Sequence, residues 1–186
     1  MQSIADEILI GKIAKGDRLA MEALFARYRV RVFRFLARMV RNEATAEELN
    51  SDVFLDIWRQ AKTFEGRSAV STWIFSIARF KALNVLQRRP EAELDEEKVA
   101  EIEDQADDPE VVLAKKDKAA VLRRCLAKLS AEHREIVSLV YYQQKSVEEV
   151  AAIVGIPEAT VKTRMFYARK KLSELLTEQG IERGWP

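Results

Sequence analysis

The residues best suited to bind a ligand by their types and spacing lie in the last third of the chain. Ser146 can cap a short helix, Gly155 can take the left-handed conformation that ends it, and Pro157 suits the first turn of a second helix. Ala151 is small enough to let the two helices approach, and Val161 can pack the second helix back onto the first. The segment is therefore predicted to be a helix-turn-helix, whose second helix fits the major groove of DNA.

The outer face of this second helix carries side chains that can contact DNA. At 100° per residue, positions 161, 165, 168 and 172 point inward and leave a broad basic arc outside. Lys162 and Thr163 lie near the end that reaches base edges, whereas the arginines suit phosphates. The candidate residues are Thr160, Lys162, Thr163, Arg164, Phe166, Tyr167, Arg169 and Lys170. The alternative is a basic, solvated helix in a bundle that binds other proteins.

A second candidate surface lies on a helix predicted to start near Ser71 or Thr72, run through Gln87 and stop before Pro90. One arc of this helix is apolar and forms a core face. The other arc interleaves cations and amides with aromatic rings, which suits unpaired bases because rings stack on them while cations contact phosphates. This arc holds Trp73, Ser76, Arg79, Phe80, Lys81, Asn84, Gln87 and Arg88. Trp73 is explained equally well as a core residue at the helix start.

A third predicted helix, over residues 44–61, places aromatic and acidic side chains together. Thr45 and Glu48 at its start are typical of a capping box. Phe54 and Trp58 lie four residues apart on a strip that also holds Glu48 and Asp52. Large aromatics beside carboxylates form either a second edge of the core or a surface for a partner protein.

An arginine stripe follows one side of a longer helix predicted over residues 18–40. Its members recur at steps of three and four, opposite the apolar face: Arg27, Arg31, Arg34, Arg38 and Arg41. The stripe is either a solvated face or a surface for phosphates or for an acidic protein.

The distribution of charge divides the chain into three parts. The net charge of +1 combines 16 basic and 10 acidic residues in 1–90, 1 and 11 in 91–114, and 14 and 9 in 115–186. Few large apolar residues and much like charge predict a flexible linker at 91–114. With only 6 Gly and 4 Pro and no hairpin signal, the fold class is all-α. We expect two small helical domains with their own cores, at 8–90 and 115–180.

Several classes of function find no support in the sequence. The single cysteine, Cys125, forms no intramolecular disulfide or cysteine metal cluster, and His133 is the only histidine. No phosphate-binding glycine loop, paired-histidine zinc motif or nucleophile elbow is present, so we expect no enzyme, cofactor or metal site. The N-terminus lacks a secretory pattern, and the longest apolar stretch, 136–142, is far short of the roughly 20 residues that span a bilayer. A cytoplasmic protein without membrane insertion is expected.

The combined motifs resemble bacterial RNA polymerase sigma factors of the extracytoplasmic-function (ECF) group, in the sigma-70 family, over nearly the whole chain. Residues 52–58 (DVFLDIW) resemble region 2.2. Residues 66–74 with the Ile-Ala-Arg at 77–79 and Gln-Arg-Arg at 87–89 resemble regions 2.3 and 2.4. Residues 130–135 with the tyrosines at 141 and 142 resemble region 4.1, and residues 161–172 resemble region 4.2.

This resemblance implies a role for each surface. Region 2.2 of the family binds the β′ clamp helices of core RNA polymerase, which implies that role for Glu48, Asp52, Phe54, Asp56 and Trp58. Regions 2.3 and 2.4 melt and read the minus-ten promoter element, which implies contacts from Arg67, Ser68, Trp73, Arg79, Phe80, Lys81, Asn84, Gln87 and Arg88. Region 4.2 reads the minus-thirty-five element with the outer arc described above. The implied partners are core RNA polymerase (β′ and β subunits), promoter DNA and an anti-sigma factor.

Two departures from the family pattern stand out. Phe80 follows the Ile-Ala-Arg, where many members carry Asn, and residues 143–147 (QQKSV) replace the usual Gly-Leu-Ser-Tyr. The family also implies that the acidic linker threads through polymerase near the RNA path. The alternatives are an autonomous helix-turn-helix regulator that binds duplex DNA as a dimer, and an RNA-binding or adaptor protein that uses the arginine stripe.

Overall fold

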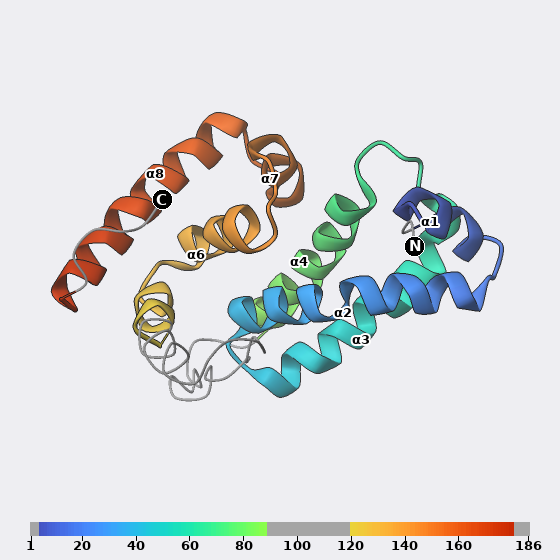
Figure 1. Ribbon diagram of the computed structural model, residues 1–186, viewed down its shortest axis with the longest axis horizontal. Helices are drawn as coiled ribbons and strands as arrows, with labels where there is room; N and C mark the ends of the chain where they lie inside the picture. The colour runs from blue at the N-terminus through green and yellow to red at the C-terminus, as the bar shows by residue number, and fades with distance from the viewer. Residues whose placement is uncertain (1–3, 89–119, 181–186) are drawn as a thin grey trace.

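A computed structural model describes residues 4–88 and 120–180, and the regular elements in these two ranges are all helical, as predicted (Figure 1). In chain order they are α1 (Asp6–Ile13), α2 (Arg18–Val40), α3 (Glu43–Gln60), the short 3₁₀ turn η1 (Ala61–Thr63), α4 (Val70–Arg88), α6 (Ala131–Val137), the π-helical turn η2 (Ser138–Tyr142), α7 (Val147–Val154) and α8 (Glu158–Glu178). A further helical segment covers residues 120–127. The acidic segment predicted as a linker, 91–114, lies outside the described residues.

The first half is a bundle in which α2 lies against both α3 and α4. Asp17 caps α2 by accepting a 3.1 Å hydrogen bond from the Ala20 N–H. At the other end of α2, Arg41 is left-handed with φ 54°. The Asn42 side chain then accepts from the Thr45 N–H at 2.8 Å, so α3 begins before the capping box predicted at Thr45. A tight α2–α3 turn results, since one residue ends the first helix and the next caps the second.

The second half contains the predicted helix-turn-helix. Ser146 and Glu149 form a reciprocal capping box at the start of α7. Gly155 ends α7 in the left-handed region, with φ 74°, and Pro157 leads into α8. The buried Val161 packs α8 back toward α7, as expected from its spacing. Therefore α7 begins and ends, and α8 begins, where the local sequence predicts.

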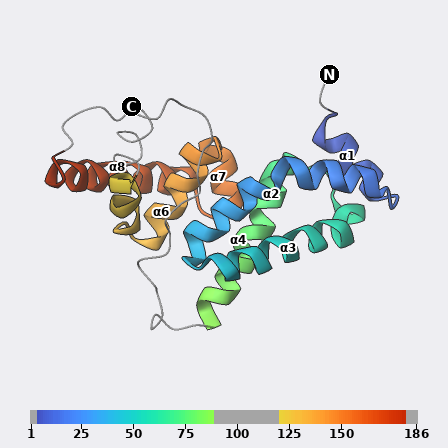
Figure 2. The same ribbon diagram turned by 60° about the horizontal axis from the view of Figure 1, so that its bottom comes forward.

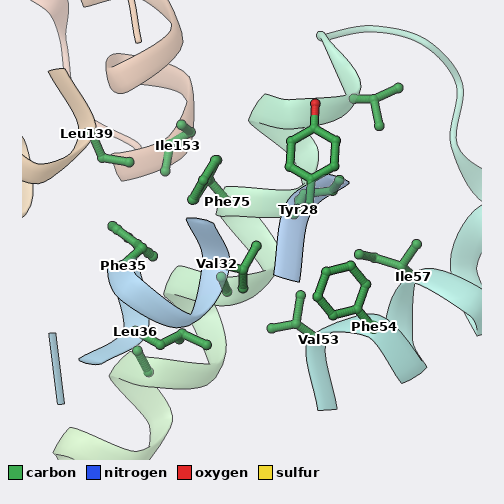
Figure 3. Close-up of a cluster of buried hydrophobic side chains, with 14 of the residues drawn as sticks. Tyr28, Val32, Phe35, Leu36, Val53, Phe54, Ile57, Phe75, Leu139 and Ile153 are labelled. Atoms are coloured by element: carbon green, nitrogen blue, oxygen red, sulfur yellow. The ribbon is translucent and has the colours of Figure 1, made fainter. Parts of the chain in front are cut away.

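The hydrophobic core differs from the expectation of two separate cores. Within the described residues, the larger cluster runs through both halves: Phe35 and Phe75 of the first half join Leu139 and Ile153 of the second (Figure 3). A smaller cluster centred on Leu172 lies between α8 and residues 120–137. Because a helical unit of about 60 residues buries only part of its apolar surface alone, α4 and α7 cover each other's remaining apolar side chains.

Candidate nucleic-acid interface

The outer face of α8 is open to solvent. Six of its eight predicted residues are exposed, namely Lys162, Thr163, Phe166, Tyr167, Arg169 and Lys170. The other two, Thr160 and Arg164, are half-buried at the borders, and Arg164 pairs with Glu132 of α6 at 3.0 Å. The helix-turn-helix thus brings the predicted arc together on one surface.

An aromatic pair gives this face an apolar part. Phe166 is 60% exposed and Tyr167 53% exposed, and their rings meet edge to face with centroids 5.4 Å apart. Large rings that are exposed at the surface are suited to contact a ligand. Thr163 donates its hydroxyl to the Ala159 carbonyl at 2.9 Å, which leaves the hydroxyl lone pairs available as acceptors.

On α4 the predicted minus-ten residues divide into two groups. Phe80 is 65% exposed, and Gln87 and Arg88 are exposed, as are Arg67 and Ser68 of the loop before the helix. Arg67 pairs with Glu65 at 2.5 Å. This first group is therefore exposed to solvent and accessible to DNA.

The remaining predicted minus-ten residues are half-buried, and two of them form ion pairs within the protein. Arg79 pairs with Glu135 of α6 at 2.7 Å, and Lys81 pairs with Asp56 of α3 at 2.8 Å. Trp73 is half-buried, with its ring centroid 5.0 Å from that of Phe64. Ser76 donates to the Thr72 carbonyl, and Asn84 is half-buried. The structure therefore does not present the whole predicted set on one free surface.

On α3 the structure identifies a different apolar residue from the one predicted. Phe54 is only 4% exposed and packs edge to face on Phe25, so its ring belongs to the core. The neighbouring Leu55 is 47% exposed, and it lies three residues after the exposed Asp52 and directly before Asp56. Sequence reasoning missed Leu55, although its position between these carboxylates and off the buried seam was a usable signal.

The other predicted residues of α3 are exposed or half-buried, so they can form part of a surface strip. Glu48 and Asp52 are exposed, Asp56 is half-buried, and Trp58 is half-buried against the larger cluster. We define the acidic strip as Glu48, Asp52, Leu55 and Asp56. Around the exposed Leu55 it holds two exposed carboxylates, Glu48 and Asp52, and a third, Asp56, that is paired with Lys81 of α4.

The arginine stripe of α2 is mostly occupied by the protein itself. Arg31 donates to the side-chain and main-chain oxygens of Gln143 at 3.1 and 3.2 Å. Arg38 lies 3.8 Å from the centroid of the Tyr142 ring, and its burial lowers the pKa of the guanidinium. Arg27 pairs with Asp6. Neither a solvated face nor a free ligand surface describes this stripe, because α1 and the second half of the chain pack against it.

Metal and membrane features can be assessed for the same part of the chain. Across residues 4–88 and 120–180, no three His, Cys, Asp or Glu side chains gather in a way that could hold a metal ion. None of the helices in these ranges combines the length and hydropathy that a membrane span needs.

Comparison with known proteins places this architecture in a family. The Sigma-70 region 2 model matches residues 24–90, and the Sigma-70 region 4 model matches residues 119–172. The sigma factor CarQ of Myxococcus xanthus is 36% identical over 173 residues, covering 90% of this chain and 95% of CarQ. The chain belongs to the sigma-70 family of RNA polymerase sigma factors, in the ECF group.

Other relatives agree with this assignment. The ECF RNA polymerase sigma-E factor of Escherichia coli K12 is 27% identical over 180 residues, covering 92% of this chain and 94% of the relative. Among solved structures, the sigma factor RpoE of Bartonella quintana, in complex with the anti-sigma factor NepR, matches with a TM-score of 0.68 and 26% identity. That match covers 87% of this chain and 98% of RpoE. The family consists of sigma factors, which are not enzymes.

Proposed function

We propose that this sigma factor binds core RNA polymerase and directs initiation at promoters through two DNA-reading surfaces. The observation that carries the proposal is that one chain combines the exposed cationic and aromatic face of α8 with the acidic strip of α3. A regulator that acts alone on duplex DNA needs the first surface but has no use for the second.

The minus-thirty-five element is the proposed ligand of α8. Lys162 and Thr163, near the N-terminal end of the helix, contact base edges in the major groove. Arg169 and Lys170, two turns further on, contact phosphates, and the Phe166–Tyr167 pair packs against the groove wall. Thr160 and Arg164 border this contact.

The unpaired minus-ten strand is the proposed ligand of α4 and the loop before it. Phe80 is the exposed ring on which a base stacks, and Gln87 and Arg88 extend the surface along the backbone. Arg67 and Ser68 bind from the loop. Trp73, Arg79 and Lys81 complete the set once their present partners release them, together with the half-buried Asn84.

Core polymerase is the proposed ligand of the acidic strip. Its carboxylates suit a basic surface on the β′ subunit, and Leu55 supplies an apolar anchor at the centre. Trp58 and the buried Phe54 support this strip from below. The second half of the chain contacts the β subunit, so that both subunits are partners.

An anti-sigma factor is the proposed regulator, in the cytoplasm where transcription takes place. RpoE of Bartonella quintana was crystallised with such an inhibitor, NepR, and this chain resembles RpoE over most of its length. An inhibitor that binds here would cover the acidic strip or the DNA-reading faces.

Transcription in vitro with purified core polymerase and a library of promoter fragments tests the proposal. We expect initiation from a subset of fragments that share two elements. Lys162→Ala and Thr163→Ala should each change base preference in the upstream element by about 1–3 kcal/mol per contact. Tight binding of palindromic duplex by the chain alone, without initiation, would instead identify an autonomous regulator.

Leu55→Ala tests the polymerase contact separately. We expect weaker binding of core polymerase by about 1–2 kcal/mol, because an exposed aliphatic anchor is lost, with an unchanged melting temperature. Leu19→Ala is the matched control, since Leu19 is 76% exposed but lies on α2, outside the strip. Equal affinities of the two variants for polymerase would remove Leu55 from the binding surface.

A further inference from the structure

A cleft rich in arginine side chains lies where the two halves of the chain meet. In Figure 2, α6 lies beside α2 and α7 lies beside α4, and residues of these helices and of α8 line the cleft. Its volume is about 270 Å³. Pockets for small ligands begin at about 300 Å³, so the cleft has the size for a small organic molecule.

The lining of the cleft carries more positive than negative charge. Within the described residues, four guanidiniums line it but only two carboxylates do. Each carboxylate already has an arginine partner, since Glu135 pairs with Arg79 at 2.7 Å and Glu132 pairs with Arg164 at 3.0 Å. The other two guanidiniums leave an excess of positive charge, which matches a doubly charged anion.

Arg38 of α2 and Arg134 of α6 carry this excess. Among the described residues, neither has a carboxylate partner. Arg38 donates to the Arg34 carbonyl at 3.3 Å and Arg134 to the Ala127 carbonyl at 3.1 Å, which leaves most N–H donors of both guanidiniums available. Burial is the main cause that lowers the pKa of both groups. Because a buried cation without a counter-charge is costly, the two side chains favour a bound anion.

Ser138 provides an independent observation that points to a ligand. Its side chain lines the cleft and is 1% exposed, yet its Oγ has no hydrogen-bond partner in the part of the chain that the structure describes. Buried hydroxyls are nearly always hydrogen-bonded, so this one is suited to donate to an oxygen of a ligand. Ser138 also begins the π-helical turn η2, and such turns occur frequently at functional sites.

The remaining wall of the cleft is largely apolar. Met39 of α2, Leu83 and Leu86 of α4, Val154 at the end of α7 and Ile156 after it contribute to the lining. Apolar walls bind the hydrocarbon or aromatic part of a ligand, while a few polar groups fix its orientation. The cleft therefore suits a molecule with one charged end and an apolar body better than an inorganic ion.

We propose that this cleft binds a small phosphomonoester with an apolar body. Its phosphoryl oxygens accept hydrogen bonds from Arg38, Arg134 and Ser138, and its body packs on the apolar wall. A phosphomonoester carries about −1.5 to −2 charges at neutral pH, and its oxygens match the donor geometry of guanidinium groups. Because α2 and α6 belong to different halves, the ligand stabilises the folded chain. The three residues that hold the phosphoryl group belong to none of the surfaces proposed for promoter or polymerase.

Titration calorimetry of the full-length chain with phenyl phosphate tests the site. We expect saturable binding, about fivefold or more tighter than that of inorganic phosphate, because only the ester covers the apolar wall. Benzyl alcohol, which lacks the phosphoryl group, should not bind. The proposal is overturned if phenyl phosphate shows no saturable binding, or if it binds no more tightly than inorganic phosphate.

A double variant distinguishes the cleft from general attraction by positive charge. Arg38→Gln with Arg134→Gln removes the unbalanced cations, and affinity for phenyl phosphate should fall about tenfold or more. The matched control is Arg18→Gln with Arg123→Gln, which removes the same charge from exposed positions on α2 and on the segment 120–127. The control should bind like wild type, and circular dichroism checks that both variants are folded. An equal loss in the control would assign the binding to net charge and overturn the site.

Ser138→Ala is a milder test, because it removes one hydroxyl and keeps the packing. Affinity for phenyl phosphate should fall about tenfold, as for other hydrogen bonds to charged groups. The melting temperature of the ligand-free chain should not fall, because the Oγ has no partner among the described residues. Ser173→Ala, at an exposed position of α8, is the control. Equal affinities of the two variants would contradict the proposed position of the phosphoryl group.

DNA is the competing explanation for the two arginines. A short single strand of mixed sequence should bind the cleft double variant and its matched control equally, since both lose the same charge. A larger loss in the cleft variant would assign Arg38 and Arg134 to DNA and overturn the small-ligand site. Promoter-dependent transcription is measured separately. A chain that initiates transcription but does not bind phenyl phosphate fails only this inference, and one that binds without initiating fails only the proposed function.

Discussion

The helices α4 and α8 both carry cations proposed to contact DNA, but they differ in what those cations already bind. On α8, Arg169 and Lys170 are exposed at the surface. On α4, Arg79 is paired with Glu135 and Lys81 with Asp56, both within 2.8 Å. The cations of α8 are therefore accessible to DNA in the folded chain, whereas the accessibility of Arg79 on α4 depends on how the two halves are arranged.

The largest expected effect is on stability and comes from Phe75, whose side chain packs against residues of both halves. Its side chain is fully buried, lies 5.4 Å from Phe35 in an edge-to-face pair and adjoins Leu139 and Ile153 (Figure 3). Phe75→Ala should cost about 3–5 kcal/mol in the free energy of unfolding and lower the energy transfer. Denaturant titration measures the first effect. Energy transfer between fluorophores on cysteines introduced at Glu47 of α3 and Ser173 of α8, both exposed, in a Cys125→Ala background, measures the second, because it reports the distance between the halves.

Leu172→Ala is the counterpart that leaves the contact between the halves intact. Leu172 is buried in the smaller cluster, so its truncation should cost about 2–5 kcal/mol. Transfer efficiency of the folded variant should stay at the wild-type level. If Leu172→Ala loosened the contact between the two halves as much as Phe75→Ala, the larger cluster would have no special part in holding the halves together.

A smaller effect is expected on DNA affinity, and it should differ between the cations of α8 and those of α4. In the free chain, Lys162→Ala should weaken binding of a mixed-sequence duplex, because an exposed cation next to the groove is lost. Arg79→Ala should not weaken binding of a single strand, because Glu135 already holds that guanidinium. Fluorescence anisotropy at one fixed salt concentration measures both. A loss of affinity in Arg79→Ala of the size seen for Lys162→Ala would mean that Arg79 is free to bind DNA.

The smallest effect is a pH dependence of the contact between α4 and α7, where Thr72 donates a hydrogen bond to Glu149 at 2.8 Å. Burial tends to raise the pKa of the Glu149 carboxyl, but hydrogen bonds from Lys145, Ser146 and Thr72 outweigh burial and bring the pKa below its usual 4.5. Because the folded pKa is lower than the unfolded one, Glu149 stabilises the closed fold above pH 4.5, and this contribution is lost as the pH falls through the lowered value.

Energy transfer recorded from neutral pH down to acid therefore reports on Glu149. Wild type should open as the carboxyl is protonated, and Glu149→Gln should show a flatter profile over the same range. Glu148→Gln, at the exposed neighbouring position, is the control and should follow wild type. A Glu149→Gln profile that coincides with wild type would show that another group governs the transition.

The elements and the helix-turn-helix could be predicted because their signals are local. Ser146 and Gly155 act on backbone groups within a few residues, so their types alone indicate where α7 begins and ends. Apolar spacing identified the helices for the same reason. These features depend on short stretches of sequence and need no knowledge of the tertiary arrangement.

The state of the α4 surface could not be predicted, because its partners lie far away in the sequence. Glu135 is 56 residues from Arg79, and Gln143 is 112 residues from Arg31. No periodicity links such pairs. The sequence left Phe54 open between a core edge and a partner surface for a related reason: α3 packs against both α2 and α4, so more than one of its strips is buried and the ring packs on Phe25.

The π-helical turn η2 restricts which changes in chain length this segment can tolerate during evolution. The Gln143 N–H bonds back five residues to the Ser138 carbonyl at 3.1 Å, which gives the turn one residue more than an α-helix needs. Deleting one residue here would restore regular helix but rotate everything that follows by about 100°, including Gln143 and Lys145. Residues 138–142 should therefore tolerate substitutions better than insertions or deletions. We expect the length of this segment to vary far less among related sequences than its amino-acid composition.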